Sequence, residues 1–171
     1  MTLHRSILPM GQRARLLEVQ GVDKTFNGAV VALRRMNLTV NEGDFISLLG
    51  PSGCGKSTAL RLIAGLTRPT AGRILWSGGQ GVGDLGVVFQ EPTLMPWATV
   101  AKNVWLPFRL RGQSFAAVRD RITTALDLVG LENFHDAYPR ELSGGMKMRV
   151  SIARAFVTNP RLILMDEPFA G

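Results

Sequence analysis

The sequence predicts an α/β fold with an N-terminal antiparallel β layer and a helical subdomain inserted into the core. Three observations lead to this prediction. An apolar run, Phe45–Leu49, passes directly into a glycine-rich loop and then into a helical pattern. Before this run, short apolar segments are bounded by turn residues, as strands are. After it, two stretches carry apolar residues at helical intervals. The 171 residues, 46% of them hydrophobic, suffice for one core, since domains commonly have ~100–200 residues.

The N-terminal layer comes after residues 1–15, for which we expect a flexible extension. Turn residues at Phe26-Asn27-Gly28 and at Asn41–Asp44 divide the next part of the chain into short apolar segments. The segments predicted as strands are Leu16–Val22, Val30–Leu33 and Met36–Val40. Together they indicate a small antiparallel layer.

The central elements come after Phe45–Leu49. Lys56–Leu66 predicts a helix, because its apolar residues share one face. Arg73–Trp76 and Leu85–Phe89 predict two more strands, and the glycine-rich Ser77–Gly83 between them predicts a loop. From Glu91 to Leu106, two prolines and two tryptophans replace any alternation, so no helix or strand is predicted there.

The last third of the chain alternates helix and strand. Ser114 is the predicted N-cap of a helix that ends at Gly130, and a second helix is predicted from Ser143 to the break at Asn159-Pro160. These helices belong to a helical subdomain at about residues 92–157. Leu162–Met165 is a continuous apolar run between a proline and two acids, which predicts a fully buried parallel strand.

Residues 50–57 match the pattern G-x-x-x-x-G-K-[ST] and predict a phosphate-binding loop. Glycines let backbone N–H groups surround a phosphate without a Cβ in the way. The following helix adds the positive end of its dipole, Lys56 reaches the β and γ oxygens, and the Ser57 hydroxyl can bind Mg²⁺. The predicted nucleotide-binding residues here are Gly50, Pro51, Ser52, Gly53, Cys54, Gly55, Lys56 and Ser57. This loop alone does not separate transporters from GTPases or helicases.

Two acids, Asp166 and Glu167, directly follow the apolar run Leu162–Met165. In open α/β sheets, ligands bind at the carboxyl ends of the strands. We therefore expect Asp166 to hold Mg²⁺, through water, and Glu167 to polarise the water that attacks the γ-phosphate.

A second glycine-rich helix start lies at Leu142–Met146, where Ser143 can cap the helix and the amides of Gly144 and Gly145 are unobstructed. One nucleotide does not obviously need two such helix starts. Here the sequence resembles the ABC ATPase family, whose signature LSGGQ corresponds to Leu142–Met146. The resemblance covers nearly the whole chain and rests on all three motifs in the family's order. It implies a P-loop NTPase core of the RecA-like kind.

The resemblance also implies roles for single residues. Gln90 matches the glutamine that touches Mg²⁺ or the attacking water, and Phe26 matches the aromatic residue that stacks on adenine, where the family more often has Tyr. With ATP and Mg²⁺ as cofactors, the implied catalytic residues are Glu167, Lys56 and Gln90. The implied metal ligands are Ser57, Asp166 and Gln90. Thr58, Ser143, Gly144 and Gly145 join the nucleotide-binding residues.

The family assembles as a head-to-tail dimer, in which the signature of one protomer closes over the nucleotide of a second ATPase protomer. Pro92–Val104 resembles the segment of importers that docks on transmembrane permease subunits, with Met95 and Trp97 as exposed anchors; packing beneath the helical subdomain is the alternative. The stretch from Gln90 to Leu110 is most similar to importers of nitrate, sulfonate and taurine. A substrate-binding protein would then be an indirect partner, and the chain would lie on the cytoplasmic face of the inner membrane as a peripheral subunit.

The resemblance stops at Gly171. In the family, an aspartate-containing loop, further strands and a switch histidine come next, and neither His4 nor His135 lies where that histidine belongs. We therefore expect a C-terminally truncated domain that lacks part of its core. An exposed sheet edge and poor solubility of the chain alone would result.

Composition leaves two other functions open. The net charge of +7 could serve a soluble ABC protein that acts on nucleic acid, but the basic residues are scattered and no aromatic series accompanies them, so no nucleic acid is expected. The chain could also be a fragment that binds ATP without turnover. The sequence has no apolar run of membrane-spanning length, no secretory signal and one cysteine, Cys54, which is typical of a cytoplasmic protein.

Overall fold

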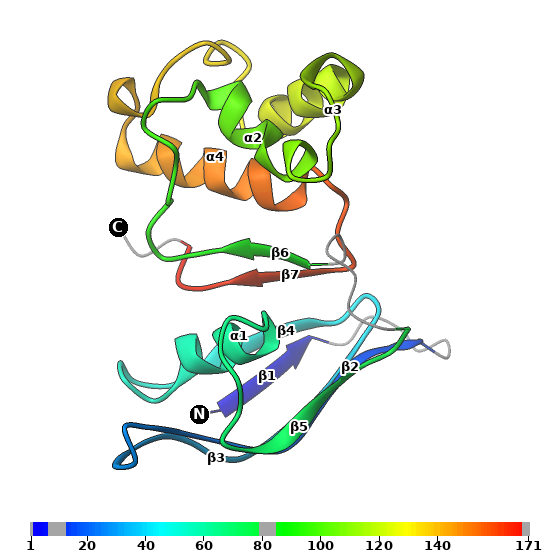
Figure 1. The fold of residues 1–171 in the computed structure, drawn as a ribbon, viewed down its shortest axis with the longest axis vertical. Coiled ribbons are helices and arrows are strands. Elements are labelled where there is room, and N and C mark those ends of the chain that lie inside the picture. The colour runs from blue at the N-terminus through cyan, green and yellow to red at the C-terminus, as the bar shows by residue number, and fades with distance from the viewer. Residues whose placement is uncertain (1, 7–12, 79–84, 169–171) are drawn as a thin grey trace. The chain divides into compact units, whose positions relative to one another are not determined.

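The computed structural model describes residues 2–6, 13–78 and 85–168, with side chains from residue 13 onward. The chain divides into two compact units, residues 1–81 and residues 82–171. Figure 1 shows the elements of each unit. Among the described residues, no helix is both long and apolar enough to span a bilayer.

The first unit contains a three-stranded antiparallel sheet in the order β3-β2-β5. Its strands are β2 (Arg15–Phe26), β3 (Val30–Asn41) and β5 (Ala71–Trp76). The antiparallel layer expected from the sequence is thus confirmed. The inward face of the sheet is formed by buried aliphatic residues, and more exposed residues lie between them along the strands. The buried residues are Leu17, Val19, Val22, Leu33, Met36 and Val40.

β3 is one continuous strand, so the prediction of two strands here is wrong. The interruption in the apolar pattern corresponds to an irregularity within the strand. Arg35 has a left-handed φ of 44°, and its backbone N–H donates to Asp23 Oδ1 at 2.6 Å. The pairing with β2 shifts register between Val19 and Val22 and again between Val22 and Lys24. A bulge therefore carries the strand across two arginines without ending the sheet.

A second, two-stranded sheet pairs β4 (Phe45–Leu49) with β1 (Thr2–Ser6) in antiparallel register, Thr2 opposite Leu49. β1 lies within residues 1–15, where a flexible extension was expected. After β4 the chain enters the phosphate-loop motif and then α1 (Lys56–Ile63), which buries Ala59, Leu62 and Ile63. The predicted order strand, loop, helix is confirmed.

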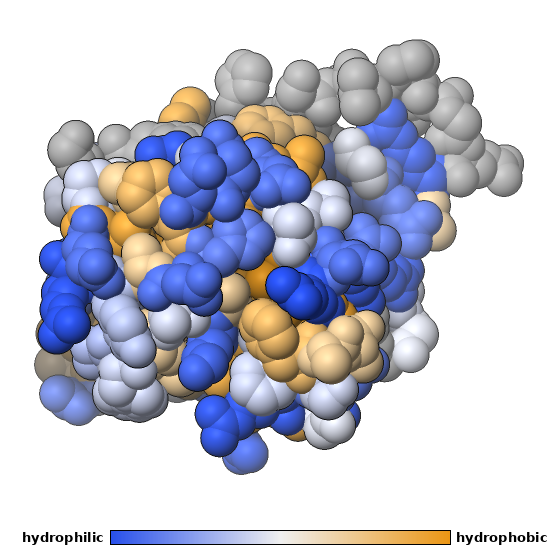
Figure 2. All heavy atoms as spheres, turned by 90° about the horizontal axis from the view of Figure 1, so that it is seen from above, coloured by the Kyte–Doolittle hydropathy of each residue, from blue (hydrophilic) through white to orange (hydrophobic). Residues whose placement is uncertain are grey.

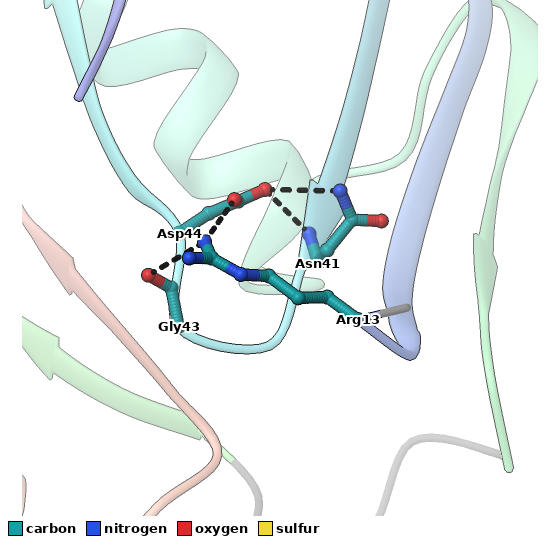
Figure 3. Close-up of polar contacts among 4 residues, drawn as sticks. All are labelled: Arg13, Asn41, Gly43 and Asp44. Carbon is teal, nitrogen blue, oxygen red and sulfur yellow. Dashed lines mark hydrogen bonds and ion pairs between the residues drawn. The ribbon is translucent and has the colours of Figure 1, made fainter. Parts of the chain in front are cut away.

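The turn from β3 into β4 is held by the carboxylate of Asp44, whose side chain is only 1% exposed. Its Oδ2 accepts hydrogen bonds from the backbone N–H of Asn41 at 2.8 Å and from Asn41 Nδ2 at 3.2 Å. Arg13 Nη1 lies 3.4 Å from Asp44 Oδ1 and from the carbonyl oxygen of Gly43 (Figure 3). This cluster fixes the position at which β4 starts, and β4 leads directly into the phosphate loop.

The second unit has a parallel pair of strands, β6 (Leu85–Val88) and β7 (Leu162–Met165), with Leu85 opposite Leu162 and Val88 opposite Met165. The prediction of a parallel strand at Leu162–Met165 is confirmed. The prediction that it is fully buried is wrong, because only Leu164 is buried and Met165 is 40% exposed. Within the described residues β7 has one hydrogen-bonded neighbour, β6.

In the part of this unit that the structure describes, the helical segments are α2 (Val100–Arg109), α3 (Phe115–Leu128), the 3₁₀ turn η1 (Pro139–Glu141) and α4 (Gly144–Phe156). Ser114 and Ser143 cap α3 and α4, as predicted, by accepting from the backbone N–H groups of Ala117 and Met146. The core of the unit is formed where these helices meet. Its largest fully buried side chains include Val100, Val104, Phe108, Ile122, Leu126, Leu131 and Val150.

α2 has no counterpart in the sequence-based prediction. Thr99 caps it by accepting from the backbone N–H of Lys102 at 3.4 Å. Its apolar side is formed by Val100, Val104 and Phe108, four residues apart, which is helical spacing. The prolines and tryptophans nearby obscured this pattern, although Pro107 lies within the helix near its C-terminal end.

α4 lies directly against β6, as Figure 1 shows. A Cβ atom at Gly86 would lie 2.3 Å from the carbonyl oxygen of Ala155, a separation that real Cβ atoms do not reach. The absence of a side chain at Gly86 therefore sets how closely the C-terminal part of α4 approaches the sheet. The short connection from α4 to β7 keeps this end of the helix near the start of the strands.

Candidate functional site

The predicted phosphate loop lies between β4 and α1 in the first unit. Gly55 is the N-cap of α1 with a left-handed φ of 96°, and no side chain caps the helix. No acid lies in the first helical turn. Pro51, Ser52 and Gly53 are exposed. The helix N-terminus therefore offers uncapped backbone N–H groups and the positive end of its dipole at an open loop, which suits a phosphate.

The loop could not hold this path with a side chain at Gly55. A Cβ there would lie 2.5 Å from the carbonyl oxygen of Ala32 and 2.8 Å from Leu33 Cδ2, both on β3. The α1 N-terminus thus approaches the backbone of β3 at a distance that only glycine allows. The glycine of the motif serves packing as well as conformation.

Lys56 lies over the loop that precedes it. Its Nζ donates to the carbonyl oxygens of Gly50 at 2.8 Å and Pro51 at 3.1 Å. The ammonium group is thereby held over the first residues of the loop. Ser57 and Thr58 follow in the first turn of α1 and are half-buried, as is Cys54.

Phe26 ends β2, immediately before the turn at Asn27 and Gly28. The isolated residue type would suggest a core position, but the side chain is 41% exposed. Lys24 Nζ lies 4.9 Å from the ring centroid. An exposed ring that already carries a cation on one side is suited to stacking against a planar group.

The acidic residues lie in the second unit, after the parallel strands. The backbone N–H of Asp166 donates to the carbonyl oxygen of Val88 at 2.9 Å, so the ends of β6 and β7 are joined. Asp166 is buried at 9% exposure, whereas Glu167 and Gln90 are both exposed. Glu167 has a left-handed φ of 47°, which is uncommon for a residue with a side chain and is typical of functional sites.

The signature residues lie at the N-terminus of α4. Ser143 Oγ accepts from the backbone N–H of Met146 at 3.3 Å, and Ser143, Gly144 and Gly145 are exposed. A Cβ at either glycine would meet no atom within 4 Å. Because α4 ends near the start of β6 and β7, its N-terminus points toward the end of the unit where both strands finish. The signature, Gln90 and the two acids therefore face the same end of the second unit.

The candidate metal ligands are distributed over both units, with Ser57 in the first and Asp166 and Gln90 in the second. The described residues contain no group of three or more His, Cys, Asp or Glu side chains that could hold a metal ion. A hydroxyl, a carboxylate and an amide oxygen are hard ligands that suit Mg²⁺, which usually keeps several waters and takes its remaining ligands from phosphate.

Two side chains that the sequence did not single out organise the segment after Gln90. Asn103, fully buried on α2, makes four hydrogen bonds with the backbone of residues 95–99. Arg154 on α4 donates to the carbonyl oxygens of Pro92 and Thr93, each at 3.0 Å. The sequence did carry one signal for Asn103, because it is a polar residue among the apolar residues of α2. Trp97 lies in this segment with 76% exposure, as predicted, whereas Met95 is half-buried.

A protein-family model described as "ABC transporter" matches residues 33–170. The chain belongs to the ABC transporter family. It is 50% identical over 91% of its length to an uncharacterized ABC transporter ATP-binding protein of Methanocaldococcus jannaschii, and 48% identical over 91% to the nitrate import ATP-binding protein NrtD of Synechocystis. It is also 43% identical, over 91%, to the spermidine/putrescine import protein PotA of Nitrosospira multiformis.

Solved structures of the ABC transporter family share the fold. A dimeric ATP-binding cassette in a post-hydrolysis state, bound to ADP and phosphate, matches with a TM-score of 0.82 and 34% identity, covering 91% of this chain and 75% of that chain. The predicted P-loop NTPase fold is therefore confirmed. The chain spans 60% of the length of the first two curated relatives and 44% of PotA.

Proposed function

We propose that this ABC transporter chain is the ATP-binding and ATP-hydrolysing part of an importer that drives uptake of a small anion such as nitrate, a sulfonate or taurine. The observation that carries the nucleotide part is the uncapped N-terminus of α1 with Lys56 held over the exposed loop. The relative NrtD is named as a nitrate import protein, which supports an importer and an anionic substrate. The relative PotA is named as a spermidine/putrescine import protein, which points to another substrate class.

The residues divide the chemistry between them. Bound MgATP supplies the transferable phosphoryl group. The backbone N–H groups of the phosphate loop and of the first turn of α1, together with the Lys56 ammonium, would hold its phosphates and offset their charge. Ser57 and Asp166 would hold the metal, Asp166 through water, and Gln90 would contact the metal or the attacking water. Glu167 would orient that water and accept its proton, and Phe26 would stack on the adenine.

The proposal includes two kinds of partner. A second copy of the chain would bring Ser143, Gly144 and Gly145 to the nucleotide in a head-to-tail dimer, which the dimeric solved relatives support. Permease subunits would dock on the segment that carries the exposed Trp97, and a substrate-binding protein would act through them. The chain would then lie on the cytoplasmic face of the inner membrane. Figure 2 shows one face of the molecule, where apolar side chains are interspersed with hydrophilic ones.

Titration with a fluorescent ATP analogue and Mg²⁺ tests the central part of the proposal. The chain should give a saturable signal, and Lys56→Ala should weaken binding at least about tenfold, or ~1.4 kcal/mol. Lys102→Ala, which removes a lysine from α2 in the other unit, is the matched control and should bind normally. A folded chain without saturable binding would refute the proposal.

A turnover assay on the same samples separates hydrolysis from binding alone. Phosphate release that depends on Glu167 is expected for the proposed ATPase. Saturable binding with no release, also in the presence of a cognate permease, would leave a nucleotide-binding fragment and contradict the catalytic part of the proposal.

A further inference from the structure

Arg154 connects helix α4 to the segment that follows Gln90. Its Nη1 donates to the carbonyl oxygen of Thr93 at 3.0 Å, and its Nη2 donates to the carbonyl oxygen of Pro92 at 3.0 Å and to Thr93 Oγ1 at 3.1 Å. A further contact, to Ser151 Oγ at 3.5 Å, aligns the guanidinium with its own helix. Both ends of the planar fork are used, and three of the four acceptors belong to two consecutive residues.

The stretch that Arg154 holds has an unusual backbone. Thr93 adopts a left-handed φ of 45°, which costs a residue with a β-branched side chain free energy and needs support from its surroundings. The three hydrogen bonds from Arg154 to Pro92 and Thr93 supply that support. The guanidinium is half-buried, and this burial lowers its pKa from the ordinary arginine value.

Asn103 holds the other end of the same segment. Its Oδ1 accepts from the backbone N–H of Met95 at 2.7 Å, and its Nδ2 donates to the carbonyl oxygens of Met95, Ala98 and Thr99. Residues 92–99 are thus fixed at two points, and the exposed Trp97 lies between two of the residues that Asn103 binds. Displacement of Pro92 and Thr93 would therefore reach Met95 after a single intervening residue, Leu94.

The position of this link in the unit connects it to the nucleotide-binding residues. Arg154 belongs to the helix that begins at Ser143, and Pro92 comes two residues after Gln90. Arg154 therefore joins two parts of the chain that each carry a residue proposed to contact a nucleotide: Ser143 at the start of α4, and Gln90 just before the segment with Pro92. Arg154 itself is not one of these residues.

We propose that Arg154 is a positioning residue that locks the segment Pro92–Thr99 to helix α4, so that nucleotide binding changes the state of this segment. The inference rests on the proposed function, since it requires that the chain bind MgATP. The fork geometry is essential to it. Lysine keeps the charge but is a point donor that cannot match consecutive acceptors in a plane, so Arg154→Lys breaks the link.

Arg149 offers a matched control on the same helix. Its Nη1 donates to the carbonyl oxygens of Val129 and Gly130, at the end of α3, at 2.9 and 3.2 Å. Arg149→Lys therefore makes the same chemical change in a guanidinium that also binds two consecutive carbonyl oxygens, but it leaves Pro92 and Thr93 untouched.

Hydrogen exchange of peptides that contain the Met95 amide, measured with and without MgATP, tests the inference. In the unaltered chain and in Arg149→Lys, MgATP should change exchange in this peptide at least about threefold. In Arg154→Lys the MgATP effect should disappear, while the affinity for a fluorescent ATP analogue stays within about twofold.

The outcomes separate this inference from the proposed function. Loss of saturable ATP binding in the unaltered chain would refute the proposed function. Two outcomes would overturn the role of Arg154 alone, provided that ATP binding is normal. In the first, MgATP leaves hydrogen exchange at Met95 of the unaltered chain unchanged. In the second, MgATP changes this exchange in Arg154→Lys as much as in the unaltered chain.

Discussion

At the scale of single residues, Gly55 has two reasons to be glycine, and they can be separated by experiment. Its φ of 96° is strained for any other residue, and a Cβ would also overlap the carbonyl oxygen of Ala32. Gly53 shares the first reason only, because its φ is 79° but a Cβ there meets nothing within 4 Å.

Gly53→Ala should therefore lower the free energy of unfolding by ~1–2 kcal/mol, the cost of the left-handed backbone. Gly55→Ala should cost a further ~1–3 kcal/mol because the loop and β3 must also move apart. Urea denaturation of both variants measures the difference. Equal losses would show that the contact with Ala32 has no energetic weight.

Phe26 provides a second prediction at this scale. If its exposed ring stacks on adenine, Phe26→Ala should weaken binding of the ATP analogue by ~1–3 kcal/mol, the usual contribution of a stacked base. Phe26→Tyr keeps the ring and should bind like the unaltered chain. Because the ring is exposed, neither change should alter thermal stability much. Unchanged affinity in Phe26→Ala would place the adenine elsewhere.

At the scale of elements, the contact between α4 and β6 depends on Gly86. Gly86→Ala should lower the free energy of unfolding by at least ~1–3 kcal/mol, because the new Cβ must displace the helix end at Ala155. Gly145→Ala, in the first turn of α4, is the control. Its Cβ meets no atom within 4 Å, and alanine favours a helix over glycine, so stability should hold or rise. A similar effect of the two changes would contradict tight packing at Gly86.

The sequence predicted elements well where a local signal agreed with the tertiary structure. The caps Ser114 and Ser143 and the strand before the phosphate loop lie where their patterns indicated. α2 was missed because its helical spacing coincides with a proline-rich surrounding. β3 was split because a bulge at Arg35, stabilised by the distant Asp23, looks locally like a strand end. A hydrogen bond between residues this far apart leaves no periodic pattern in the sequence.

At the scale of the whole molecule, the proposed dimer makes Gly144 a residue whose loss affects association and leaves the single chain intact. Gly144→Ala should keep thermal stability, since its Cβ meets nothing within the chain. It should weaken MgATP-dependent dimers at least about tenfold, or ~1.4 kcal/mol, because the Cβ would lie where the partner's nucleotide approaches. Sedimentation with MgATP measures this, and the unaltered chain without MgATP gives the baseline. Normal dimers of Gly144→Ala would contradict the proposed arrangement.

The candidate site could be predicted from sequence to the extent that it consists of contiguous motifs. Lys56 and Ser143 act through neighbours a few residues away, so their spacing revealed them. Asn103 and Arg154 were not predictable, because the backbone atoms they bind are defined only once α2 and α4 are packed. The exposure of Phe26 likewise depends on its place at the end of β2, since the residue type alone favours burial.

The antiparallel pairing of β1 with β4 has a practical consequence for anyone who purifies this chain. Thr2 is opposite Leu49, the residue immediately before Gly50. A segment joined ahead of Thr2 therefore emerges beside the phosphate-binding loop, where a polyhistidine or acidic tag would compete for metal or repel an anion. Tags at this end should be cleaved before nucleotide affinities are measured.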